Sequence, residues 1–258
     1  MTTTAARGRL LLVPNTLDLG APDAPRIDAV LPAAVLQEAA RLAHWVAEDA
    51  KTTRAFLKRV NAVAPLARPL QAIDIRELPR PPKGMRQPAR ATDLAPLLAP
   101  ALAGADIGLI SEAGLPAVAD PGAALVAAAH RLSIDVLPLA GPSSLLLALA
   151  ASGLNGQSFA FVGYLPTDAA ERTTRVQALQ QQSRREHQTQ LAIETPYRNG
   201  ALMAALLAAL QPDTQLSVAC GLTLPGGWCK TRTVAQWRAQ PPAFDNKHLP
   251  AVFLWLAH

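Results

Sequence analysis

The sequence predicts an α/β protein of two domains, in which short buried strands alternate with helices. Apolar runs of strand length recur along the chain and end in turns rich in glycine, proline and polar residues. Helical patterns lie between these runs. The chain has 258 residues, half of them hydrophobic, and can therefore bury a large core. We expect domains at residues 1–140 and 141–258, each a mostly parallel or mixed sheet flanked by helices.

Residues 111–144 are the region on which this prediction depends most. A strand expected at 106–110 ends on Ser111-Glu112-Ala113-Gly114, where polar and turn residues replace the apolar run. Asp120-Pro121-Gly122 then has the pattern of an N-cap carboxylate and a proline in the first helical turn, which predicts a helix over 123–132.

A second strand is expected at 134–139, and it ends on Gly141-Pro142-Ser143-Ser144, which again precedes a helix. Two strands joined by a crossover helix form a parallel unit, and ligands of open α/β sheets bind outside the carboxyl ends of such strands. We therefore expect the loops 111–120 and 140–144 to lie side by side and to form the binding site.

The remaining elements follow from the same patterns. Strands are expected at 9–13, 44–47, 73–78, 159–163, 190–194, 215–220 and 251–257. Helices are expected at 33–42, from about 50 to 60, and at 92–103, 145–151, 168–187 and 201–210.

Composition narrows the function classes. The formal charge of +5 is compatible with an anionic partner. Two cysteines, Cys220 and Cys229, occur without a cluster of metal-ligand spacing, which predicts a reduced, metal-free, cytoplasmic protein. We find no signal peptide and no apolar run long enough for a membrane span, so a soluble protein is expected. Neither GxGxxG nor GxxxxGK[ST] is present, which argues against nucleotide hydrolysis.

The segment from Ser111 to Gly122, SEAGLPAVADPG, and the Gly-Pro-Ser block at 141–143 resemble the tetrapyrrole methylase superfamily, the class III S-adenosylmethionine-dependent methyltransferases. They are most similar to its branch that 2′-O-methylates small-subunit ribosomal RNA, methyltransferase I. Glu48 to Arg54 is similar to that branch's Glu-Asp-Thr-Arg segment, and 194–198 to its Glu-Ser-Pro-His-Arg turn. The turns at 14–18 and 221–224 depart from the pattern, because the first lacks glycine and the second lacks its charges.

The resemblance implies two α/β domains with a cleft between them that holds S-adenosylmethionine mainly by main-chain groups, and it implies a homodimer. Carried over residue by residue, it places the cofactor at five positions in the two loops, namely Gly114, Leu115, Val118, Ser143 and Ser144. No metal is implied.

Methyl transfer to a ribose hydroxyl requires that the acceptor lose its proton, so a carboxylate or lysine within hydrogen-bond reach would assist. The candidates are Glu112, Glu48, Lys51 and Glu194. Glu112 can equally be a carboxylate bonded to turn amides. Glu48 and Asp49 can equally cap the helix that follows them. For Asp49 we favour that structural role.

A stretch with four cations and no acid, Arg80, Lys83, Arg86 and Arg90, follows the strand at 73–78. Such a run is commonly a solvated linker, and a basic flap that touches RNA phosphates is the alternative. A helix with several arginines, expected at 168–187, has the same two interpretations.

Three functions remain open from the sequence. The first is a methyltransferase acting on a ribose 2′-hydroxyl of ribosomal RNA, which the signature and the net charge favour. The second is a methyltransferase of the same fold acting on a small molecule such as a tetrapyrrole, which the altered turns at 14–18 and 221–224 favour. The third is a non-catalytic module that binds the cofactor. The small number of aromatic residues argues against base stacking but not against chemistry at the ribose.

Overall fold

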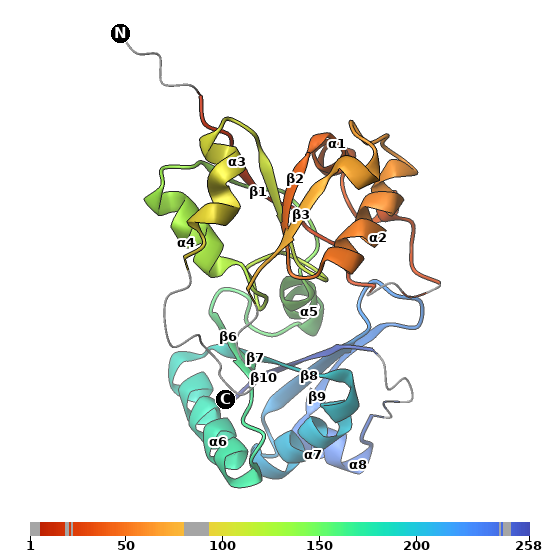
Figure 1. The fold of residues 1–258 in the computed structure, drawn as a ribbon. Helices are drawn as coiled ribbons and strands as arrows, with labels where there is room; N and C mark the ends of the chain where they lie inside the picture. The colour runs from red at the N-terminus through yellow and green to blue at the C-terminus, as the bar shows by residue number, and fades with distance from the viewer. Residues whose placement is uncertain (1–5, 19–20, 22, 80–92, 243, 245–248) are drawn as a thin grey trace. The chain divides into compact units, whose positions relative to one another are not determined.

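The computed structural model describes residues 6–18, 21, 23–79, 93–242, 244 and 249–258. The chain divides into two compact units, Met1–Pro142 and Ser143–His258. Each unit contains a five-stranded sheet with helices on both faces (Figure 1). The predicted α/β class is therefore confirmed. The basic segment at 80–90 lies outside the described residues.

The sheet of the first unit is parallel throughout, in the order β3-β2-β4-β1-β5. Its strands are β1 (Leu10–Leu12), β2 (His44–Ala47), β3 (Asp74–Glu77), β4 (Ile107–Ile110) and β5 (Val136–Pro138). Every residue of β4 is buried, as expected of a strand covered on both faces. These strands lie where the apolar runs of the sequence predict them.

Helices cover both faces of this sheet (Figure 1). On one face, α1 (Ala33–Arg41) and α2 (Ala50–Asn61) pack with Leu11, Val13 and Trp45. On the other face, α3 (Ala99–Leu102) and α4 (Ala123–Arg131) pack with Leu10 and Ile107. Neighbouring residues of β1 thus enter opposite cores, because successive side chains of a strand point to opposite faces. Short 3-10 helices occur at η1 (Ile27–Ala29), η2 (Leu70–Ala72) and η3 (Ala95–Leu98).

Two expectations for helices were wrong. The segment 92–103 does not form one helix: within its described part, η3 and the short α3 follow one another, and prolines lie near the start of each. Pro96 and Pro100 lack the N–H that a continuous helix needs, so the segment is broken into turns. Asp120 is not an N-cap, because α4 begins at Ala123 and its N-cap is Gly122, without a side-chain hydrogen bond.

The arrangement of β4 and β5 also differs from the simplest expectation. The two strands are parallel, but β1 lies between them and pairs with both. The crossover through α4 therefore passes over one strand. The turn that follows β1 becomes the neighbour of both predicted loops.

The second unit has a mixed sheet in the order β6-β7-β10-β8-β9, in which only β6 and β7 pair in parallel. Its strands are β6 (Phe159–Tyr164), β7 (Thr189–Glu194), β8 (Gln215–Cys220), β9 (Trp228–Thr233) and β10 (Ala251–Leu256). Its helices are α5 (Ser144–Ser152), α6 (Ala169–Glu186), η4 (Pro196–Arg198), α7 (Asn199–Ala209) and α8 (Val234–Ala239). The strand β10 is fully buried: α5 packs on one face of the sheet, and α6, α7 and α8 pack on the other.

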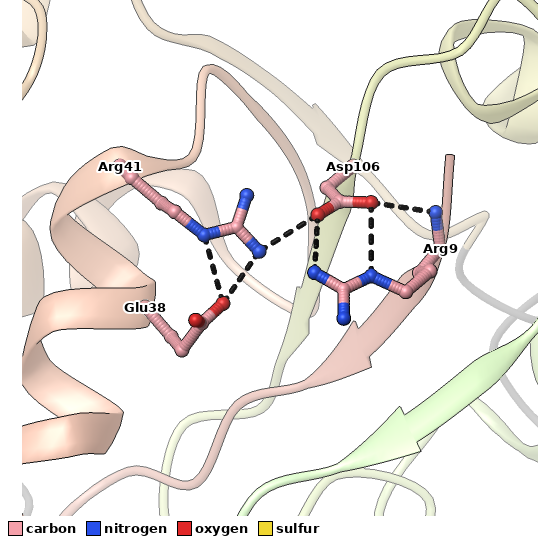
Figure 2. Close-up of polar contacts among 4 residues, drawn as sticks. All are labelled: Arg9, Glu38, Arg41 and Asp106. Atoms are coloured by element: carbon pink, nitrogen blue, oxygen red, sulfur yellow. Dashed lines mark hydrogen bonds and ion pairs between the residues drawn. The ribbon is translucent and has the colours of Figure 1, made fainter. Parts of the chain in front are cut away.

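An ion-pair network joins the amino ends of two strands in the first unit (Figure 2). Asp106 precedes β4 and accepts hydrogen bonds from the main-chain N–H of Arg9 at 2.7 Å and from Nη2 of the same residue at 2.9 Å. Arg41, at the end of α1, donates to Asp106 Oδ2 at 2.7 Å and also pairs with Glu38. Burial alone would raise the pKa of Asp106, but the hydrogen bonds from both arginines outweigh it and hold the pKa at about 2.

We expect Asp106→Asn to lower the free energy of unfolding at neutral pH by an amount on the order of 2 kcal/mol, because the lowered carboxylate pKa is itself a contribution to stability. That contribution is present above the ordinary value of 3.8 and is lost as the pH falls toward about 2. Urea unfolding of the variant beside Asp135→Asn, an exposed carboxylate at the start of β5, measures it. Equal losses in the two variants would show that the network contributes nothing of its own.

Candidate functional site

The carboxyl ends of β1 and β4 form the point where the chain changes faces of the first sheet. These two strands are neighbours, yet the chain leaves β1 toward α1 on one face and β4 toward α4 on the other. Connections that diverge in this way leave a crevice at the strand ends, and open α/β sheets bind their ligands there. The segment 111–122, which the sequence predicts to be a binding loop, begins at this point.

Asn15 joins the turn after β1 to the loop after β4. Its main-chain N–H donates to the carbonyl of Gly114 at 2.8 Å, and the N–H of Gly114 returns a bond of 3.2 Å, as in an antiparallel bridge. The Asn15 Nδ2 also donates to the carbonyls of Ser111 at 3.2 Å and Glu112 at 2.9 Å. Asn15 is buried, so these bonds are protected from water. One side chain thus fixes the start of the loop.

The loop 111–122 presents an unusual main-chain path. Gly114 has a φ of +71°, and two non-glycine residues, Ala117 and Ala119, have φ values of +67° and +66°. Alanine in this region is strained, and such strain concentrates at binding sites where the surrounding structure holds it. Leu115 is half-buried, whereas the side chain of Val118 is 45% exposed. The loop therefore offers main-chain groups and one apolar side chain to a ligand.

The turn after β5 approaches the turn after β1 so closely that only glycine fits at 141. A Cβ at Gly141 would lie 2.2 Å from Pro14 Cβ, which no packing adjustment can accommodate cheaply. A Cβ at Gly114 would lie 3.7 Å from the carbonyl oxygen of Pro142. The predicted proximity of residues near 114 and near 141 is therefore confirmed, with the turn after β1 between them.

Asp120, near the end of the loop 111–122, interacts electrostatically with Glu48 and with Glu112. Glu48, at the end of β2, accepts a hydrogen bond from the main-chain N–H of Glu112 at 3.1 Å. The pKa of Asp120 is raised to about 6, first because burial disfavours its charged form and second because Glu48 and Glu112 carry like charges. A hydrogen bond with Ser111 opposes the rise in part. The charged form of Asp120 is therefore disfavoured in the folded protein.

Asp49 has the structural role that we favoured. It is the N-cap of α2, and its side chain accepts the N–H of Thr52 at 2.8 Å. Lys51 lies in the first turn of that helix and is exposed. The cap holds α2, and with it Lys51, at the carboxyl end of β2.

An ion pair secures the turn after β1 to α2. Arg59 donates to both carboxylate oxygens of Asp18, at 3.1 and 2.9 Å, and to Thr16 Oγ1 at 3.1 Å. The Asp18 side chain is 3% exposed. A bidentate pair of this kind is among the stronger polar contacts in proteins. The turn at 14–18, which contains no glycine, is therefore held by side chains.

The other predicted site residues lie in the second unit. Ser143 is the N-cap of α5 and is buried, without a side-chain capping bond, and Ser144 is the first residue of that helix. Glu194 ends β7, pairs with Arg198 at 3.1 Å and accepts the N–H of Thr195 at 2.8 Å. Its buried carboxylate is therefore neutralised by its own turn.

Sequence reasoning missed Asn15 and Asp120 as members of the site. Asn15 follows a strand in a turn, 14–18, that contains no glycine. Only the presence of a polar residue at a strand end could have indicated that Asn15 belongs to the site. Asp120 was explained as a helix cap, and that explanation hid its proximity to Glu48. No group of three or more possible metal ligands occurs among the described residues. No helix in the described part of the chain is long and apolar enough to span a bilayer.

Comparison with known proteins gives sequence relatives named ribosomal RNA small subunit methyltransferase I. Ribosomal RNA small subunit methyltransferase I from Synechocystis is 39% identical over 127 residues, which are 49% of this chain and 44% of the relative. The protein of the same name from Pseudomonas aeruginosa is 44% identical over 95 residues, 37% of this chain and 32% of the relative. The predicted resemblance is confirmed. The matched part spans less than half the length of these relatives, and no protein-family model matches the chain.

Solved structures share the fold over almost the whole chain. A cobalt precorrin-4 methyltransferase of cobalamin biosynthesis has a TM-score of 0.55 at 14% identity, covering 96% of this chain and 94% of the other. A conserved hypothetical protein from Aeropyrum pernix has a TM-score of 0.60 at 16% identity, covering 98% and 85%. Uroporphyrin-III-C-methyltransferase from Thermus thermophilus has a TM-score of 0.50 at 21% identity, covering 97% and 94%. At these identities the likeness establishes the fold.

We expect the contribution of Asp120 to the free energy of unfolding to decrease as the pH rises from 3.8 to about 6. The folded state keeps the Asp120 proton over this range while the unfolded state releases it, so stability present below 3.8 is lost as the pH passes the folded value. Asp120→Asn should remove this loss and leave the variant at least as stable as the parent at neutral pH. Thermal melting across this pH range, with Asp135→Asn as control, measures it; parallel curves for parent and Asp120→Asn would contradict the assignment.

Proposed function

We propose that this protein is an S-adenosylmethionine-dependent methyltransferase that methylates a ribose 2′-hydroxyl of ribosomal RNA. The observation that carries the proposal is the closure of the 111–122 loop by Asn15 at the sheet's switch point. This loop is the segment that resembles the methyltransferase signature. The relatives named ribosomal RNA small subunit methyltransferase I support methylation of ribosomal RNA, and the ribose hydroxyl as acceptor rests on the resemblance.

The residues present fit the proposed cofactor in two respects. Main-chain groups of the strained alanines that follow Gly114, together with the exposed Val118, offer polar and apolar contacts to an adenosine, and Gly114 remains a proposed contact on the strength of the resemblance. The carboxylates of Glu48 and Asp120 supply a negative potential that suits a sulfonium cation and an amino group. Leu115, Ser143 and Ser144 remain proposed contacts on the strength of the resemblance.

The cofactor, when bound, supplies a methyl group already activated by the positive sulfur. The protein must then align the acceptor and assist the loss of its proton. Of the four candidate bases, Glu48 holds the main chain of Glu112, and Glu194 is paired with Arg198. Glu112 is exposed at the start of the loop. We assign the proton transfer to Glu112 because of its position two residues before Gly114 at the carboxyl end of β4, with Lys51 as the next candidate.

A methyltransferase acting on a small molecule such as a tetrapyrrole is the second hypothesis, and a cofactor-binding module without turnover is the third. The structural relatives include enzymes named for tetrapyrrole and precorrin methylation, but their low identity limits the comparison to fold. The homodimer implied by the resemblance stays a prediction.

We expect S-adenosylmethionine to bind one site per chain, with an affinity that rises as the pH increases through about 6, because the cation then meets a deprotonated Asp120. Isothermal titration calorimetry over this range measures it. Asp120→Asn should bind without that pH dependence. The demethylated product, which lacks the sulfonium charge, serves as the matched control ligand. Failure of both compounds to bind at millimolar concentration would remove the methyltransferase proposal.

Incubation of the protein with radiolabelled cofactor separates the three functions. We expect label in total RNA and none in a small-metabolite extract. Label in the extract alone would support the second hypothesis, and cofactor binding without label in either would support the third.

We expect Glu112→Gln to bind the cofactor normally and to lose about a hundredfold in single-turnover rate, the usual cost of removing a general base. Glu48→Gln is the matched variant: it weakens the acceptor for the Glu112 N–H, so its cofactor affinity and melting temperature should fall together. If Glu112→Gln shows that second pattern instead, Glu112 only braces the loop and Lys51 becomes the candidate.

A further inference from the structure

We propose that the exposed face of α2, together with the hollow at its carboxyl end, binds the phosphate backbone of the RNA substrate. This inference rests on the RNA methyltransferase function proposed above. It assigns the part of the first unit that positions the RNA, whereas the strand-end loops are assigned to the cofactor and the chemistry.

The cations of α2 form one continuous face. Lys51, Arg54 and Lys58 are exposed, and their spacing of three and then four residues places them on the same side of the helix. The opposite side buries Phe56, Leu57 and Val60 among its core contacts. From Lys51 to Lys58 the helix rises about 10 Å. The positive charges therefore form a row along the surface.

These three cations differ from most arginines of the same unit in having no acidic partner. Pairs with acidic side chains are formed by Arg9, Arg26, Arg41, Arg59 and Arg76. No acidic residue occurs within α2, and among the described residues none pairs with Lys51, Arg54 or Lys58. Uncompensated charges of one sign create a surface potential that attracts a polyanion.

A hollow of about 360 Å³ continues this row beyond the helix end. Lys58, Asn61 and Arg68 line it, together with apolar parts of residues 66–70. The Asn61 Oδ1 accepts the N–H of Leu66 at 3.0 Å, which fixes the loop and leaves the amide nitrogen as a donor. Two cations and an amide donor around one depression suit a phosphate with its attached ribose.

The row begins beside the proposed site. Helix α2 starts at Ala50, two residues after Glu48, whose carboxylate holds the Glu112 N–H. A ribose at the strand-end loop would therefore continue into a backbone lying along α2. Three of the four arginines of α6 are engaged: Arg172 bonds to the carbonyls of residues 166 and 167, Arg184 to that of His258, and Arg185 pairs with Glu186. On α2, Arg54 donates to the carbonyl of Ala50 in its own helix, which leaves its charge without an acidic partner. The observations therefore favour α2.

The test uses a variant with three substitutions, Arg54→Gln, Lys58→Gln and Arg68→Gln, in the full chain. All three positions are exposed, and Lys51 is kept because it is a candidate for the chemistry. Fluorescence anisotropy with a fluorescein-labelled single-stranded RNA is measured over a salt series. Each phosphate contact adds about 0.7 to the slope of log affinity against log salt, so the slope should decrease by up to about 2 and the affinity at low salt should fall at least about tenfold.

A control variant, Arg131→Gln with Arg175→Gln and Arg185→Gln, removes the same charge from exposed positions on α4 and α6. It should change the slope little. An equal decrease in both variants, or no decrease in the α2 variant, overturns the proposal. Calorimetry with S-adenosylmethionine should give the same affinity for both variants and the parent.

The outcomes also separate this inference from the proposed function. If the parent transfers methyl groups to RNA but the α2 variant binds RNA as the parent does, the surface is wrong and the function stands. If the parent binds RNA through α2 but transfers no methyl group to any RNA, the function is wrong and the surface stands.

Discussion

The site depends on the bonds that Asn15 makes across the switch point of the first sheet. Two main-chain bonds to Gly114 and two side-chain bonds to the carbonyls of 111 and 112 fix the beginning of a loop that is otherwise strained. Buried carbonyls left without these partners would cost free energy of about 1–3 kcal/mol each. The positive φ values at Ala117 and Ala119 persist because the loop is held at this end and enters α4 at the other.

The two ends of the first sheet carry charge differently. At the amino ends, Asp106 is matched by Arg9 and Arg41, and its pKa is lowered to about 2 (Figure 2). At the carboxyl ends, Asp120 lies near Glu48 and Glu112, and its pKa is raised to about 6. The matched cluster stabilises the fold. The unmatched one costs stability, and a bound cation would offset that cost. This contrast is the physical reason for placing the function at the carboxyl ends.

The helix α2 connects the two proposed roles of the first unit. Its N-terminus is fixed by the Asp49 cap, and its Arg59 holds the turn after β1 through Asp18. The buried side of the helix thus positions the site, while its exposed side presents unpaired cations. One amphipathic helix can have both roles because the helical period separates its apolar, buried residues from its charged, exposed residues.

The sequence by itself determined the α/β class, nearly every strand, the resemblance to methyltransferases and the importance of 111–122. Those features depend on local patterns: apolar runs of strand length, glycine and proline at turns, and a capping side chain such as Asp49. The break at 95–102 was predictable from Pro96 and Pro100 and was missed because the apolar pattern was given more weight.

Only the tertiary structure decided that β1 lies between β4 and β5, and this decided which residues meet. The position of β1 depends on how apolar faces of distant segments pack, which no local pattern records. It brings Asn15 to Gly114 across 99 positions of sequence, and Pro14 against Gly141. The proximity of Glu48 to Glu112 likewise results from the pairing of β2 with β4. The charge balance that raises the pKa of Asp120 exists only once these strands are paired, because electrostatic repulsion depends on distance in space.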